Sequence, residues 1–182
     1  MKPWRLILIL TCTIMIGGLS FGQETKPSTD LKQKIKTFKN SKRFAVDYDK
    51  FKDETHVHVG PFFTMPLGMS AHFFFKGQTV QEDIDKIYLT FHSYSSDWRF
   101  LNDRTLYAII DGERTELRDA DRSSDISLGS VSETLIYTLP TDTFRKIAEA
   151  KTIQLRVGSV EVKVKDEHQI AFKDLLTLTK RE

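Results

Sequence analysis

The strongest constraint on the fold is a strict alternation of apolar and more polar side chains in the middle of the chain. Ile87, Leu89 and Phe91 are each separated by a single, more polar residue. A period of two places three large apolar groups on one face, as in a half-buried β-strand. The stretch around Ile87 is therefore predicted to be a strand with one face in the core.

A tight turn is predicted shortly after this strand. Residues 105–110 are rich in β-branched and aromatic side chains and end in Asp111-Gly112. This dipeptide accommodates the positive φ angles of a type I′ hairpin turn, so residues 113–117 are predicted to form the returning strand. We expect residues 86–117 to form an antiparallel meander, which argues against a parallel doubly wound sheet.

The remaining sequence predicts more short strands and at least two helices. Further strands are predicted at 44–48, 55–59, 69–75, 131–139, 152–157 and 160–164, with a polar loop at 118–130. Phe144, Ile147 and Ala148 mark the buried face of a short helix, and Phe172 that of a later one. The fold class is thus mainly β, a β-sandwich or rolled antiparallel sheet of about 8–9 strands. A short helix is expected near 142–150 and a C-terminal helix near 166–179.

The N-terminus is typical of a secretory signal peptide. Lys2 and Arg5 precede a short apolar core, and Ser20 and Gly22 are small residues at a cleavage site. We expect export through this cleavable signal peptide, to the periplasm or as a secreted protein; an uncleaved membrane anchor is the alternative. Of 27 basic and 25 acidic residues, two basic ones lie in the signal, so the remainder is balanced. A balanced domain gives no electrostatic argument for nucleic-acid binding.

Three segments are therefore expected: a signal peptide at 1–22, a polar lysine-rich linker or short helix at 23–43, and a single β-rich domain at 44–182. The only cysteine, Cys12, lies in the signal, so no disulfide is expected. Asp30 could cap a helix that has Leu31, Ile35 and Phe38 on one stripe. The lysine-rich residues 26–43 could make weak contact with a membrane surface, or the helix could dock on the sheet.

An apolar segment at 61–75 departs from alternation and contains Pro66. Four of its residues are candidates for contact with a partner or ligand: Phe62, Phe63, Met65 and Leu67. The proline pattern predicts irregular structure for the segment at 62–68. The segment is either a loop folded over the core or an exposed apolar lip.

Histidine supplies the only candidate chemistry. His56 and His58 lie at i and i+2 on one face of a predicted strand, a spacing that can chelate zinc or copper. His72 and His92 lie on other predicted strands and could converge with them; exposed strand histidines without a metal are the alternative. Asp47 is interpreted as a solvated strand residue. No nucleophile elbow, zinc-protease, P-loop or dinucleotide motif occurs, so no catalytic residue and no cofactor are predicted.

Several short motifs give the chain a family resemblance. Residues 48–53 followed by Thr55, residues 95–100, and the ending with Phe144, residues 147–150 and residues 156–162 resemble a group of uncharacterised exported bacterial β-rich proteins. The resemblance spans roughly residues 44–178 and implies only secretion and a β-rich domain with a C-terminal helix.

Three functions follow from these observations. The first is an exported non-enzymatic domain that binds a protein or cell-envelope partner. The alternatives are a carrier of a small apolar ligand or lipid, and a metal-dependent enzyme using the strand histidines.

Overall fold

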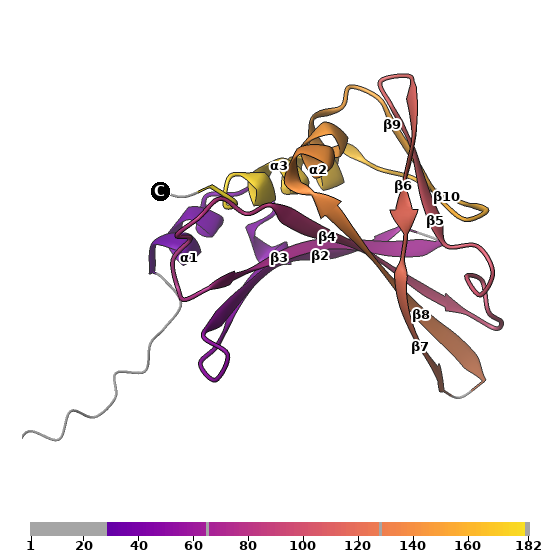
Figure 1. Ribbon diagram of the computed structural model, residues 1–182, viewed down its shortest axis with the longest axis horizontal. Helices are drawn as coiled ribbons and strands as arrows, with labels where there is room; N and C mark the ends of the chain where they lie inside the picture. Colours follow the sequence, from indigo (N-terminus) through magenta and orange to yellow (C-terminus); the bar gives the residue numbers. More distant parts are fainter. Residues whose placement is uncertain (1–28, 65, 128, 181–182) are drawn as a thin grey trace, which may run out of the picture.

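The structure, a computed structural model, describes residues 29–64, 66–127 and 129–180 and contains two antiparallel sheets with three α-helices beside them (Figure 1). The predicted mainly β class is confirmed, and ten strands lie in the described residues. The signal peptide predicted at 1–22, the start of the lysine-rich segment and Met65 lie outside the described residues.

The larger sheet has six strands in the order β1-β2-β3-β4-β8-β7. Their bounds are β1 Phe44–Asp49, β2 Glu54–Thr64, β3 Leu67–Lys76, β4 Lys86–Ser95, β8 Ser130–Pro140 and β7 Asp121–Ser127. All neighbours pair antiparallel. The sheet alternates as predicted: Ile87, Leu89 and Phe91 are buried on one side, which we call the inner face.

The smaller sheet has four strands in the order β10-β9-β5-β6. Their bounds are β10 Val160–Val162, β9 Ile153–Val157, β5 Thr105–Ile110 and β6 Glu113–Asp119. The β5–β6 hairpin is confirmed, and Asp111 and Gly112 have the expected positive φ angles of 50° and 90°. The predicted meander is wrong, because β4 already pairs with β3 and β8 on its two edges and leaves none for β5. The chain instead crosses from one sheet to the other between β4 and β5.

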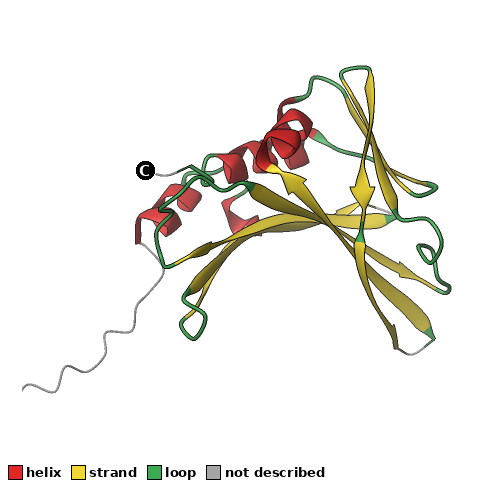
Figure 2. Cartoon of the chain, in the orientation of Figure 1, coloured by secondary structure: helices red, strands yellow, loops and turns green. Residues whose placement is uncertain are grey.

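The helices lie along one side of the larger sheet, as Figure 2 shows in red. They are α1 Thr29–Lys36, α2 Thr141–Glu149 and α3 Asp166–Leu176, with a 3-10 helix at Ser41–Arg43. The predicted short and C-terminal helices are confirmed. Phe144 and Phe172 are both buried, and the centres of their rings are 5.0 Å apart. Leu31 and Ile35 of α1 join the same core, so the apolar stripe of the lysine-rich segment docks on the protein.

The prediction of irregular structure after Pro61 is wrong, because β2 continues to Thr64 and β3 begins at Leu67. A bulge between Val59 and Phe62 absorbs the proline, and Gly60 adopts φ 111° within it. The pairing with β1 ends at Val59, so Pro61 has no ladder bond to break on that side.

The prediction of a polar loop at 118–130 is also wrong. This segment contains the end of β6 and all of β7, an edge strand that pairs only with β8. Most of its side chains are exposed on both faces of the sheet. An edge strand exposed in this way needs no apolar alternation, so its sequence resembles that of a loop.

Candidate metal site on the outer face

The face of the larger sheet opposite the core, which we call the outer face, collects the histidines of β2 and β3. Antiparallel register places Asp47 of β1 directly opposite His56 of β2. It places His58 of β2 directly opposite His72 of β3. Directly opposite residues project on the same side of a sheet with Cβ atoms about 4.5–5.5 Å apart. Four metal-ligating side chains from three adjacent strands therefore share one small area.

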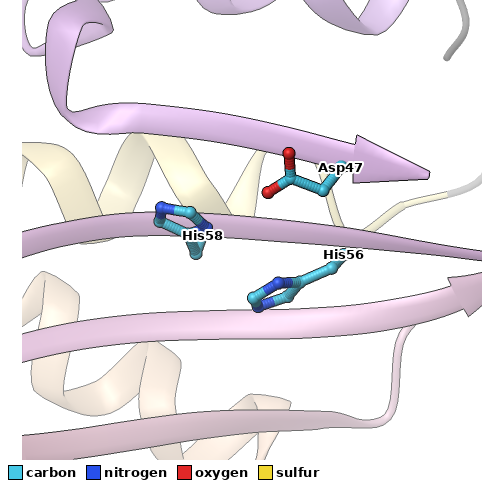
Figure 3. Close-up of side chains that lie close together, drawn as sticks. All are labelled: Asp47, His56 and His58. Carbon is cyan, nitrogen blue, oxygen red and sulfur yellow. The ribbon is translucent and has the colours of Figure 1, made fainter. Parts of the chain in front are cut away.

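Three of these side chains form a compact ligand set. One ligand atom from each of Asp47, His56 and His58 lies within 4.8 Å of the other two. Figure 3 shows the carboxylate and the two imidazole rings coming from neighbouring strands. The two rings are 5.2 Å apart and tilted by 40°. Two imidazoles and one carboxylate at this separation can converge on one transition-metal ion.

The two imidazoles have unused coordinating atoms. His56 Nε2 and His58 Nδ1 are both shielded from solvent and have no hydrogen-bond partner. Burial, together with the neighbouring His58, lowers the pKa of His56, while Asp47 and Glu54 act in the opposite direction. A neutral imidazole is the form that binds a metal ion, so this shift favours the ligating state at neutral pH.

Aromatic rings enclose the site on the β3 and β4 side. The His56 ring stacks on Phe74 at 4.4 Å, and the His72 ring stacks on Tyr88 at 5.1 Å. His72 meets His56 edge-on at 5.1 Å. Burial is the largest of the causes that lower the pKa of His72 to about 4, and the neighbouring histidines, His92 among them, contribute to the same shift. The ring of His72 is therefore neutral over the physiological range.

Sequence reasoning anticipated part of this cluster. His56, His58 and His72 do come together as the prediction allowed, but His92 lies further along the outer face, within reach of Thr134 Oγ1 at 3.2 Å. Asp47, interpreted from the sequence as a solvated strand residue, is exposed as expected, and it is also the third member of the ligand set. Antiparallel pairing of the strands predicted at 44–48 and 55–59 was the signal that could have placed it there.

The residues predicted to contact a partner lie on different faces of the sheet. Phe62 and Leu67 are each 1% exposed and belong to the core, whereas Phe63 is 75% exposed on the outer face. Of the described members of that set, Phe63 alone is available to a partner. Phe73 and Met69 are fully buried as well, so the inner side of residues 62–75 is packed by protein.

A second polar cluster, missed from the sequence, lies on the inner face. Glu133 of β8 is fully buried, and its carboxylate accepts hydrogen bonds from the backbone N–H groups of Arg99 and Phe100 at 2.8 and 3.2 Å. Arg122 Nε of β7 donates a third at 3.0 Å. The Arg122 guanidinium in turn lies 4.7 Å from the centre of the Trp98 ring. This cluster fastens the crossover between the two sheets to β7 and β8.

No family model, curated protein or solved structure matches this chain. Among the described helices, none is both long and apolar enough to cross a membrane. The geometry of the outer face is therefore the basis for a functional proposal.

Proposed function

We propose that this protein binds one divalent transition-metal ion, of the zinc or copper class, through Asp47, His56 and His58. One observation supports this above all others: three potential ligand atoms lie within 4.8 Å of one another. The unpartnered nitrogens of His56 and His58 point to the same conclusion, since buried polar atoms in proteins normally have a partner. A bound ion would supply that partner.

The donor set selects the class of ion. Calcium and magnesium take oxygen ligands, and two of the three donors here are imidazole nitrogens. Imidazole suits zinc, copper, iron and nickel, and sites with two histidines and one carboxylate occur for several of these metals. Two ligands, His56 and His58, come from alternate positions of a central strand, so the sheet holds them in place before the ion arrives.

Calorimetric titration of Zn²⁺ into the full chain tests the proposal. The chain is purified without a polyhistidine tag and stripped with a chelator. We expect one ion per chain, loss of binding in H56A and H58A, and weaker binding in D47N. At a hundredfold excess over Kd, the ion should raise the free energy of unfolding by about 2.7 kcal/mol.

The matched control is H92A, which removes a histidine from the same face but outside the ligand set. H92A should bind Zn²⁺ like the unmodified chain. The proposal is wrong if the unmodified chain takes up no Zn²⁺, or if H56A and H92A bind it equally well.

Export and partner binding stay predictions. Export depends on residues 1–22, and the partner interpretation now depends on Phe63 among the described candidates. The carrier interpretation required an apolar cavity beneath residues 62–75, where Phe62, Leu67, Met69 and Phe73 are packed in the core.

A further inference from the structure

We infer that His72 is the fourth ligand of this site, so that the ion is held by four protein side chains and has no position open for a substrate. The inference rests on the proposed function and deepens it. A zinc site with four protein ligands is of the structural or holding kind, whereas a catalytic site keeps one position for water. The identity of the fourth ligand therefore decides between a metal-binding protein and a metal-dependent enzyme.

Register is the first argument. His72 lies directly across from His58 on the adjacent strand, and its ring centre is 5.1 Å from that of His56. The His56 and His58 rings are 5.2 Å apart. The His56 ring therefore has two other imidazole rings close by, and His72, which lies outside the set of Asp47, His56 and His58 in the metal-free protein, is placed to join it.

The present contacts of His72 are the second argument. Its ring is stacked nearly parallel, at 13°, on Tyr88 and meets Phe74 edge-on at 5.4 Å. Neither contact is a hydrogen bond to a ring nitrogen. A rotation about its own side-chain bonds would exchange ring stacking for a metal–nitrogen bond, with the protein backbone fixed.

Glu54 is the competing protein ligand. It lies on the outer face two residues before His56, and its carboxylate is 3.9 Å from Lys76 Nζ. The ammonium group of Lys76 competes with a metal ion for this carboxylate, and the side chain of Glu54 is 32% exposed. His72 lies among rings and has no such competitor, so the structure favours His72 over Glu54.

Cobalt substitution in the full chain tests the inference. Co²⁺ bound by four ligands in a tetrahedron absorbs visible light strongly, whereas five- and six-coordinate Co²⁺ absorbs weakly. We expect a strong spectrum in the unmodified chain. H72F keeps an aromatic ring against Tyr88 but removes both nitrogens, so it should weaken the spectrum and lower Co²⁺ affinity roughly tenfold or more, at least as much as losing an outer-shell partner.

E54Q and H92A are the matched controls, and both should keep the spectrum and affinity of the unmodified chain. If H72F also keeps them, or if E54Q alone changes them, the inference is overturned while metal binding stands. If the unmodified chain binds no Co²⁺ and no Zn²⁺, the proposed function fails with it. Urea unfolding of H72F must show a cooperative transition; H72Q, which is smaller and polar, is the second variant if it does not.

Discussion

The two faces of the six-stranded sheet each hold a polar cluster, and the two clusters differ in how their central side chains are hydrogen-bonded. On the inner face, the carboxylate of Glu133 is fully buried and accepts three hydrogen bonds. On the outer face, His56 and His58 are only half-buried, yet each has a shielded nitrogen without a partner. The more deeply buried group is therefore the one whose hydrogen bonds are satisfied, and the less buried histidines hold the unsatisfied atoms.

This difference separates a group that stabilises the fold from a group that is available to a ligand. A buried charge whose partners belong to the same chain contributes to stability, because removing it leaves those partners unpaired. A shielded nitrogen without a partner carries a desolvation cost that no hydrogen bond offsets, and a bound ion can supply the missing partner. Substitutions on the two faces should therefore have different effects on stability and on metal binding.

Glu133→Ala should lower the free energy of unfolding by about 3–5 kcal/mol, because it leaves Arg122 and two backbone N–H groups buried without their acceptor. Urea denaturation measures this loss. Glu161→Ala, on the exposed side of β10, is the control and should change stability by less than about 0.5 kcal/mol. Equal effects of the two changes would mean that the Glu133 cluster contributes little.

Phe62 and Phe63 test the two faces at adjacent positions of β2. Phe62→Ala should cost about 3 kcal/mol, since it opens a cavity beside Phe172, whose ring centre is 6.3 Å away. Phe63→Ala should change stability by no more than about 0.5 kcal/mol, because that ring is 75% exposed. Chemical denaturation of the two variants gives the comparison, and a reversed order would contradict the assignment of faces.

Acidification should destabilise the metal-free protein through His72. Its pKa falls from 6.5 to about 4 on folding, so between these values the unfolded chain binds more protons. The stabilising contribution is complete above pH 6.5 and is lost as the pH approaches about 4. Its size is on the order of 2 kcal/mol, after an allowance for solvent exposure.

H72F removes this contribution, so its stability should fall less than that of the unmodified chain between about pH 7 and about pH 4.5. Urea unfolding at the two pH values measures the difference. Parallel losses in the two proteins would show that His72 does not titrate as the structure implies.

The smallest effect is expected for His56→Ala and His58→Ala. In the metal-free protein each substitution should change the free energy of unfolding by about 0.5 kcal/mol or less, because it removes no hydrogen bond of the folded protein. The same substitutions should abolish Zn²⁺ binding. A large loss of stability in the metal-free variants would instead mean that these histidines have a structural role, as Glu133 does.

The sequence predicted those parts of the fold in which one face is apolar. Alternation located the strand of Ile87, and helical spacing located Phe144 and Phe172. It did not locate β7, whose side chains are mostly exposed on both faces and so show no apolar alternation. It also could not assign β5 to a second sheet, because alternation identifies a strand and not its neighbour.

Only part of the candidate site could be predicted, because a sequence pattern shows positions within one strand and not pairing between strands. The spacing of His56 and His58 is visible within one strand, whereas Asp47 and His72 join them only through cross-strand register. Glu133 offered a clearer signal, since it falls on the apolar side of a strand with Leu135 and Tyr137. A lone carboxylate on such a side requires buried partners, although the sequence does not name them.

The fastening of the crossover by Glu133 also has a consequence for the order of assembly. Its backbone partners Arg99 and Phe100 lie 34 and 33 residues earlier in the chain. We therefore expect the link between the sheets to stay unanchored until β8 has been synthesised and has paired with β4. Contacts between residues so distant in sequence slow folding, so the docking of the two sheets should be a late step.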